Sequence, residues 1–360
     1  MTFASAWAGA EHGQDAICLG TSSVDVTLAR RGPLLAGDRA QTSGRIGETP
    51  MEADFINWLR SRVPGHPELK LGIGDDAAIL QPAGPGGIVV TSDMLMDGVD
   101  FVLGSCPTSD VGRKSLAVNL SDLAAMACRP LAFLVSVALP RSHAEELARK
   151  LYSGILALAA EYDIALAGGD TNTWDGPLVI SITALGQCTE RGPLRRDGAQ
   201  PGDAILVTGQ LGGSILGRHF SFAPRVQESL ALHARYALHA GMDISDGLSL
   251  DLHRLAEASG CGAALDLDTI PIHASAGELS AQRADGVSPL EHALSDGEDF
   301  ELILTLAQSE ADRLLRDQPL SIPLTQVGRM VPQPGLWQRN STGALTPLTP
   351  RGYVHRAADR

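Results

Sequence analysis

The sequence GRKSLAVNLSDLAAMA, residues 112–127, has the apolar spacing of a long helix packed into a protein core. We predict a helix from about Ser109 to Ala127 with Ser109 as its N-cap, because a serine hydroxyl can accept a hydrogen bond from the first turn. Pro130 lies just past the last turn, and the apolar run 131–139 predicts a strand. This helix-strand unit is the starting point for the rest of the fold.

Two polar residues interrupt this predicted helix. Asn119 and Asp122 are three positions apart, so they share one face of an otherwise apolar helix. One reading is a stripe that faces solvent. The other reading places Asp122 at the mouth of a metal cluster, because a carboxylate that faces a core is strongly unfavourable unless it is paired.

The flanking segments predict an α+β chain with two domains, and a turn at Pro201-Gly202-Asp203 marks the boundary. Before the boundary we expect helices at 52–63 and 142–162, the second opened by a capping box from Ser142 to Glu145, and strands at 71–73, 77–80, 88–91, 164–167 and 178–186. After it we expect helices near 224–239, 248–259 and 310–316, strands near 204–208, 263–267, 300–306 and 326–330, and an irregular segment at 332–360. The composition of residues 1–45 indicates a disordered extension, or a start codon placed too far upstream. We therefore expect the two domains to span 46–200 and 201–360.

Composition excludes several classes of protein. The net charge of −14 and the absence of a Lys/Arg block argue against nucleic-acid binding. No apolar run approaches a membrane span, and five widely spaced cysteines predict reduced thiols and a cytoplasmic location: Cys18, Cys106, Cys128, Cys188 and Cys261. With 360 residues and 44% hydrophobic content, the chain can bury a large core.

Short acidic clusters recur along the chain, at 74–77, 91–93, 121–122, 168–170 and 243–247. Carboxylates set among Gly, Ala, Ile and Leu usually pair with cations or stay hydrated, and too few basic residues lie beside these to pair them all. Oxygen ligands from Asp, Ser and Thr suit Mg²⁺, which commonly bridges to phosphate. The clusters therefore predict an enzyme that binds Mg²⁺ and a phosphate compound.

Each cluster also has a simpler interpretation. The segment 72–77 matches a dinucleotide fingerprint by letters, but two aspartates occupy the pyrophosphate positions, and a plain acidic turn remains open. Ser245 or Asp246 would serve as a helix N-cap, 168–171 would form an amide nest after a short strand, and 295–301 would be a solvated turn. Arg195 and Arg196 could contact a nucleotide phosphate or simply be exposed. The chain has no Walker A motif.

The order of the motifs resembles the thiamine-monophosphate kinase family. The matching segments are GIGDDAAIL, TSDMLMDGVDF, GRKSLAVNLSDLAAMA, GGDTN, RRDGAQPGD, MDISDGLSLDL and GEDFELIL, within residues 47–353. The resemblance implies the aminoimidazole-ribotide-synthetase-like fold, with an N-terminal mixed-sheet domain that binds ATP and metal and dimerises through its sheet, and a C-terminal α/β domain. It implies transfer of the ATP γ-phosphoryl group to thiamine monophosphate, with several Mg²⁺ ions and a homodimer as the working form.

The resemblance also implies roles for individual residues. The implied metal ligands are Asp76, Thr91, Ser92, Asp93, Asp122, Asp170, Asp243 and Asp246. The implied ATP contacts are Gly169, Asp170, Arg196 and Ser245, and the implied substrate contacts are Asp100, Glu298 and Tyr353. No catalytic residue beyond the metal ligands is implied, because a phosphate acceptor is already deprotonated near neutral pH.

The chain departs from the family pattern at two positions. Asp100 stands where the family usually has a substrate-contacting histidine, and Arg113 replaces an aromatic residue before Lys114. Other readings are a different ATP-dependent enzyme of the superfamily and a non-catalytic paralogue that binds metal and nucleotide. Selenophosphate synthetase would need a reactive N-terminal Cys or selenocysteine and the hydrogenase maturation factor a C-terminal cysteine, whereas this chain ends Ala-Ala-Asp-Arg.

Overall fold

The computed structural model describes residues 61–67, 69–71, 79–80, 87–284 and 286–354, all within the unit Thr49–Arg360. The predicted extension 1–45, most of the predicted helix 52–63 and Asp76 lie outside the described residues. Two short strands, β1 (Leu69–Leu71) and β2 (Ile79–Leu80), pair antiparallel. In the described residues, no helix is both long enough and apolar enough to cross a membrane.

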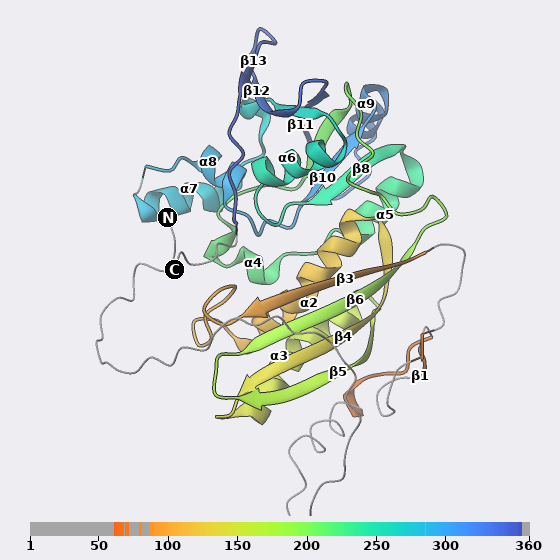
Figure 1. The fold of residues 1–360 in the computed structure, drawn as a ribbon, viewed down its shortest axis with the longest axis vertical. Helices are drawn as coiled ribbons and strands as arrows, with labels where there is room; N and C mark the ends of the chain where they lie inside the picture. Colours follow the sequence, from red (N-terminus) through yellow and green to blue (C-terminus); the bar gives the residue numbers. More distant parts are fainter. Residues whose placement is uncertain (1–60, 68, 72–78, 81–86, 285, 355–360) are drawn as a thin grey trace, which may run out of the picture. The chain divides into compact units, whose positions relative to one another are not determined.

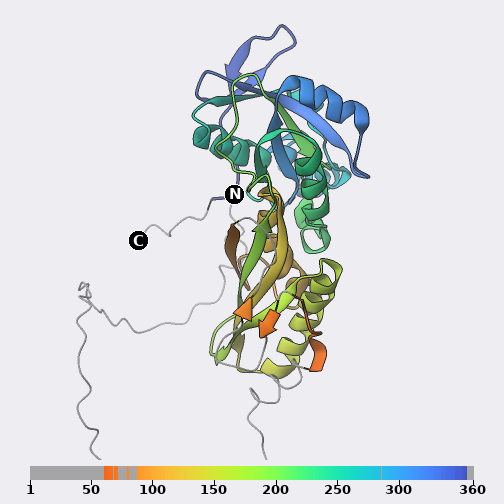
Figure 2. The same cartoon turned by 90° about the vertical axis from the view of Figure 1, so that its right-hand side faces the viewer.

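The N-terminal half is built on a four-stranded mixed sheet in the order β3-β6-β4-β5 (Figure 1). Its strands are β3 (Ile88–Met96), β4 (Cys128–Pro140), β5 (Ala165–Trp174) and β6 (Val179–Cys188). Strands β4 and β5 run parallel, and the other neighbouring pairs are antiparallel. Helices α2 (Thr108–Ala125) and α3 (Ala144–Glu161) lie on one side of this sheet (Figures 1 and 2). The predicted α+β class is confirmed.

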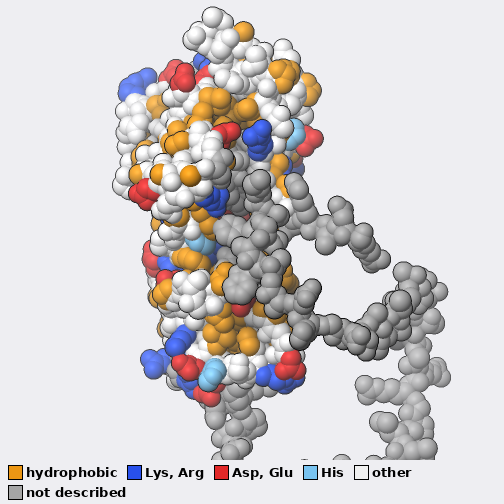
Figure 3. All heavy atoms as spheres, turned by 90° about the vertical axis from the view of Figure 1, so that its left-hand side faces the viewer, with side chains coloured by type: hydrophobic (Ala, Val, Ile, Leu, Met, Phe, Trp, Pro, Cys, Tyr) orange, Lys and Arg blue, Asp and Glu red, His pale blue; other side chains and the backbone are white. Residues whose placement is uncertain are grey.

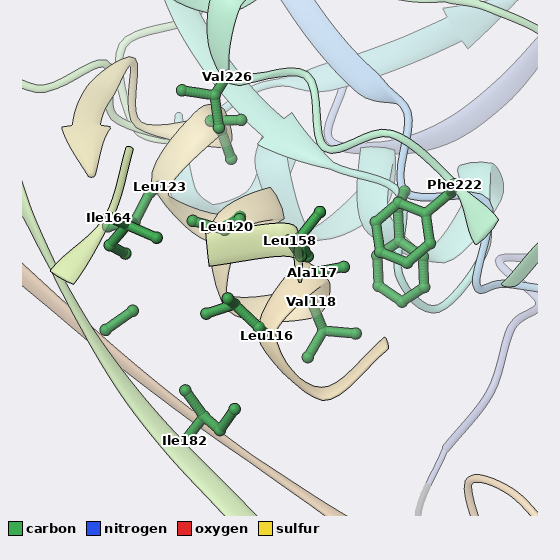
Figure 4. Close-up of a cluster of buried hydrophobic side chains, with 14 of the residues drawn as sticks. Leu116, Ala117, Val118, Leu120, Leu123, Leu158, Ile164, Ile182, Phe222 and Val226 are labelled. Atoms are coloured by element: carbon green, nitrogen blue, oxygen red, sulfur yellow. The ribbon is translucent and has the colours of Figure 1, made fainter. Parts of the chain in front are cut away.

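Helix α2 is buried around most of its circumference. Leu116, Leu120 and Leu123 are fully buried and project in different directions into one apolar cluster (Figure 4). This cluster also includes residues of the C-terminal half, where the rings of Phe222 and Phe300 stack with centroids 4.2 Å apart. The helix therefore joins the cores of the two halves.

Both predicted caps of these helices are wrong. Helix α2 begins one residue earlier than expected, with Pro107 at the N-cap, so Ser109 lies inside the first turn. Proline cannot cap through a side chain, but its fixed φ leads the backbone into the turn. At α3 the N-cap is His143 in a left-handed conformation without a side-chain cap, which excludes the Ser142 capping box.

The C-terminal half contains a seven-stranded sheet in the order β13-β12-β9-β11-β7-β10-β8. Its strands are β7 (Ala204–Thr208), β8 (Leu238–Asp243), β9 (Gly262–Leu265), β10 (Leu302–Leu306), β11 (Leu324–Val331), β12 (Gly335–Arg339) and β13 (Leu345–Pro347). The α-helices are α4 (Arg218–Ser221), α5 (Val226–Arg235), α6 (Leu248–Ala258), α7 (Ala274–Arg283), α8 (Pro289–Ser295) and α9 (Gln308–Asp317), with 3₁₀ turns η2 (Ser214–Leu216) and η3 (Leu267–Thr269). Only the β9–β12 pair is parallel, so the α/β label expected for this half does not describe its sheet.

Two predicted segments of this half need correction, and two helices were missed. The helix expected over 224–239 ends at Arg235, because Tyr236 is extended and the chain enters strand β8. The segment 332–360 is not irregular throughout, since β12 and β13 lie in it and β12 pairs with the distant β9. Helices α7 and α8 were not predicted. Strands whose partners are far along the chain and helices of ten residues or fewer give weak local signals.

Candidate active site

Strand β3 divides the TSD motif between the two faces of its sheet. The side chains of Thr91 and Asp93 face α2, and the Thr91 hydroxyl donates a hydrogen bond to the Asp122 carboxylate. Ser92 points to the other face, where its Oγ lies 3.0 Å from Oγ1 of Thr183. Because side chains alternate along a strand, only the backbone of Ser92 lies beside the acidic cluster.

Three carboxylates converge between β3, α2 and β8. Burial and the charge of Asp122 raise the pKa of Asp93 to about 7. Burial also raises the pKa of Asp122, although Thr91 and the charge of Arg196 partly offset it. Asp243 is only 6% exposed, and burial followed by the charge of Asp122 raises its pKa well above the usual range. The raised pKa values mean that the surrounding residues do not fully stabilise three ionised carboxylates in this cluster.

A pocket of about 590 Å³ opens beside this cluster. Its lining includes Thr91 from β3, Asp122 from α2, Asp243 from β8 and Arg196 from the segment before β7. The neighbouring Arg195 also lines the pocket, and it pairs with Asp197 through two contacts, one of 2.9 Å from Nε. The two arginines of the RRD motif are therefore not equivalent: Arg195 pairs with Asp197, whereas the charge of Arg196 partly offsets the raised pKa of Asp122.

The loop between β8 and α6 positions the second half of the DISDG motif. The N-cap of helix α6 is Gly247, not Ser245 or Asp246. The Asp251 carboxylate accepts hydrogen bonds from the backbone N–H groups of Asp246 and Gly247 at 2.9 and 3.1 Å. The carboxylate of Asp246 pairs with Arg254. Asp246 therefore has a cation, whereas Asp93 has an Oδ2 that is buried without a partner among the described residues.

The expected substrate contacts meet this loop through the backbone. The N–H of Glu298 donates to the carbonyl of Ser245 at 2.7 Å, and the N–H of Tyr353 donates to the carbonyl of Asp246 at 2.9 Å. Close packing of Gly352 supports this docking, because a Cβ there would lie 2.4 Å from the Asp246 carbonyl oxygen. Ser245, Asp246, Glu298 and Tyr353 therefore belong to one structural unit.

Gly169 and Asp170 lie at the opposite edge of the four-stranded sheet from Asp93. Both are in strand β5, so the amide nest expected after a short strand is wrong. The cross-strand register runs from Asp93 through Ile182 and Val135 to Gly169, which is three strand spacings or about 14 Å. Asp170 is exposed on the outer face of the sheet, in register with Ser136. A single chain does not bring this motif to the acidic pocket.

Asp100, the residue that departs from the family pattern, has local contacts. One carboxylate oxygen accepts a hydrogen bond from the N–H of Met96 at 2.7 Å, and its carbonyl accepts one from Nζ of Lys114 at 2.9 Å. The second departure, Arg113, donates from Nη1 to the carbonyl of Phe220 at 3.3 Å and so anchors α4. Asp76 lies outside the described residues.

Sequence reasoning assigned no contact to several polar residues of this region. The hydroxyl of Ser121 donates to Oδ2 of Asp243 at 2.6 Å, and Lys114 and Asn119 are buried on α2. Burial of Asn119 excludes the solvent-facing stripe for that residue. An isolated lysine in an apolar helix was an available signal, whereas His219, which joins Lys114, has no distinctive sequence context.

The donor set fits a hard divalent cation. The carboxylate oxygens of Asp93, Asp122 and Asp243 are ligands that Mg²⁺ accepts. Among the described residues, Oδ2 of Asp93 is buried without a hydrogen-bond partner, and burial raises the pKa of both Asp93 and Asp243. The described residues contain no preformed set of three ligands close enough for one ion. Mg²⁺ usually takes one or two carboxylates and completes its shell with water and substrate phosphate.

Comparison with known proteins identifies the family. Residues 74–188 match the N-terminal domain of AIR synthase related proteins, and residues 200–336 match the C-terminal domain. Thiamine-monophosphate kinase of Rhodopirellula baltica is 45% identical over 318 residues, which is 86% of this chain and 98% of that protein. The crystal structure of thiamine-monophosphate kinase from Stenotrophomonas maltophilia is 37% identical with a TM-score of 0.69, covering 79% of this chain and 95% of that chain.

A third relative, AaThiL complexed with AMPPCP and TMP, has a TM-score of 0.65 and covers 89% of this chain and 99% of that chain. At 24% identity this likeness concerns the fold alone. The first two matches span nearly the whole length of the relatives. The family that they indicate is the one that the order of the motifs predicts. The chain belongs to the thiamine-monophosphate kinase family of AIR synthase related proteins.

Proposed function

We propose that this protein transfers the γ-phosphoryl group of ATP to the phosphate of thiamine monophosphate, which yields thiamine diphosphate and ADP. The observation that carries the proposal is the pocket that joins Thr91, Asp122, Asp243 and Arg196 in a chain 45% identical to a thiamine-monophosphate kinase. A phosphate oxygen of the acceptor attacks the γ-phosphorus, and the bond to the β-phosphate oxygen breaks. The acceptor oxygen is already ionised, so the reaction needs no general base.

Asp93, Asp122 and Asp243 would hold Mg²⁺, with Thr91, Asp246 and Asp76 as further candidates. The metal, when bound, supplies the positive charge that offsets repulsion between two anionic reactants. Arg196 faces Asp122 across the pocket and would bind a nucleotide phosphate. Ser245 would contact the nucleotide from the β8–α6 loop, and Glu298 and Tyr353, tied to that loop, would orient the acceptor.

The exposed apolar face of the four-stranded sheet supports a homodimer. Val90 and Met94 of β3 are 60% and 59% exposed, and Leu134 of β4 is 38% exposed on the same face. Among the described residues, α2 and α3 pack on the opposite face. A second copy docked here would cover these side chains and would place Asp170 of each copy at the interface.

The remaining expectations belong to this proposal. The N-terminal domain would span 46–200 and the C-terminal domain 201–360, with 1–45 as a disordered extension. A cytoplasmic location suits the free thiols of Cys106, Cys128, Cys188 and Cys261. On the face shown in Figure 3, Lys and Arg side chains lie among Asp and Glu side chains.

The test is product formation by the purified protein. Thiamine diphosphate should appear from thiamine monophosphate, ATP and Mg²⁺, with ADP released in equal amount. Folded protein that forms no thiamine diphosphate but still binds Mg²⁺-ATP would favour the non-catalytic paralogue.

A further inference from the structure

A buried lysine links three segments around Glu298. Lys114 of α2 is 1% exposed, and its Nζ lies 2.9 Å from the carbonyl oxygen of Asp100 and 2.5 Å from Oε1 of Glu298. His219 of α4 is 4% exposed, and its Nδ1 lies 2.9 Å from Oε2 of the same carboxylate. Each carboxylate oxygen of Glu298 therefore faces one nitrogen.

The proton positions follow from these distances. Nδ1 of His219 is also 3.0 Å from Nζ of Lys114, and it cannot accept from the lysine while it donates to Glu298. With the proton on Nδ1, histidine donates to Oε2 and lysine donates to Oε1 and to the Asp100 carbonyl. Burial alone would raise the pKa of Glu298, but the His219 hydrogen bond and the Lys114 charge more than offset it and lower that pKa.

The backbone around this carboxylate is also restrained. Glu298 has φ of +54°, a left-handed conformation that non-glycine residues rarely adopt. Its N–H donates to the Ser245 carbonyl at 2.7 Å, and its carbonyl accepts from Oγ of Ser214 at 2.6 Å. Backbone and side chain are thus held independently, which is typical of a group whose direction matters.

We propose that Lys114 is a positioning residue for the phosphate acceptor, acting through Glu298 with the help of His219. The inference rests on the proposed contact between Glu298 and thiamine monophosphate. A charged amine on a rigid central helix fixes both the direction and the ionised state of that carboxylate. The nucleotide contact proposed at Arg196 belongs to another segment, so Lys114 should affect acceptor binding selectively.

The alternative is a purely structural latch, in which Lys114 ties α2 to the C-terminal half and Glu298 has no direct role in binding. Loss of a latch would lower stability and disturb the sites for both substrates together. Loss of a positioning residue would raise the KM for thiamine monophosphate, leave the KM for ATP unchanged and depend on the presence of Glu298. These readouts separate the two roles.

The experiment is a double-mutant cycle with Lys114→Met, Glu298→Gln and the combined variant, with both KM values measured for each. We expect each single variant to raise the KM for thiamine monophosphate about tenfold, with the KM for ATP within about twofold of wild type. The combined variant should be within about twofold of Glu298→Gln alone, and Lys114→Arg should recover most of the loss. Arg225→Met is the matched control, because it removes another buried ion pair, to Glu301 in the same segment, and should lower the melting temperature without this KM pattern.

Several results would overturn the inference. Lys114 would be a structural latch if the fold-changes of the two single variants in the KM for thiamine monophosphate multiplied in the combined variant. Equal changes in the KM values for thiamine monophosphate and ATP would lead to the same conclusion. If Lys114→Met does not fold, the combined variant still decides, because it leaves no partly buried carboxylate without its cation. Failure of both variants to fold would assign the lysine a structural role. An unchanged KM in Glu298→Gln would remove Glu298 from the acceptor site, while thiamine diphosphate formation by wild type would leave the proposed function standing.

Discussion

Replacing Asp93 with asparagine should stabilise the metal-free protein while it removes activity. A pKa raised from 3.8 to about 7 corresponds to about 4 kcal/mol against the ionised carboxylate in the folded state. Burying an amide in its place costs about 2 kcal/mol. The net expectation at pH 8 is a gain of about 2 kcal/mol in the free energy of unfolding, or about 4 °C in melting temperature for a chain of this size.

The effect should depend on pH in a defined direction. Because the folded-state pKa of Asp93 lies above its unfolded value, its favourable contribution is complete below pH 3.8 and is lost as the pH rises through 7. Wild type in EDTA should therefore lose stability over this window relative to Asp93→Asn. At pH 4 the variant should have no advantage.

The assay is thermal unfolding of both proteins in EDTA from pH 4 to pH 8, followed by turnover in excess Mg²⁺. We expect turnover of Asp93→Asn to fall at least about a hundredfold, and added Mg²⁺ to raise the melting temperature of wild type more than that of the variant. Asp175→Asn is the control, since Asp175 is 83% exposed in a surface ion pair with Arg141 and should change stability by less than about 0.5 kcal/mol. A variant less stable than wild type at pH 8, a pH-independent difference or near-native turnover would refute the account of the acidic cluster.

Nucleotide binding should weaken at least about tenfold in EDTA, measured by calorimetry, because an apo cluster of carboxylates repels ATP; tight metal-independent binding would contradict this. Met94→Glu should shift the protein from dimer to monomer in light scattering, whereas Ile272→Glu, an exposed apolar site off this sheet, should not; an unchanged mass for Met94→Glu would exclude the sheet face. Arg225→Met should cost about 3–5 kcal/mol in denaturant unfolding because it leaves Glu301 buried and unpaired, and adding Glu301→Gln should recover part of it; equal stability of the single and double variants would argue against that cause. Asp100→His should change the KM for thiamine monophosphate more than the KM for ATP, and unchanged constants in both Asp100→His and Asp100→Ala would withdraw Asp100 from the substrate site.

The sequence was most informative where local pattern and final environment agree. Helix α2, strand β4 and the α+β class follow from long apolar runs with clear periods, and the structure confirms them. No strand was predicted at β8, and the helix expected over 224–239 overlapped its first two residues, since they follow an amphipathic segment without a strong break. Strands β12 and β13 were both missed; β12 pairs with β13 and also with β9, which lies about 70 residues earlier in the chain, and pairing over that distance leaves little local trace.

The sequence by itself determined the family, because motif order and residue type survive without coordinates. It also predicted a metal site from aspartates in apolar surroundings. Only the tertiary structure decided which of them meet. Alternation along β3 separates Thr91 and Asp93 from Ser92, and sheet order puts Asp170 at the far edge. Burial alone distinguishes Lys114 and His219 from surface residues, and their contact spans 105 positions. Such pairings depend on distances through space, and spacing along the chain contains no record of them.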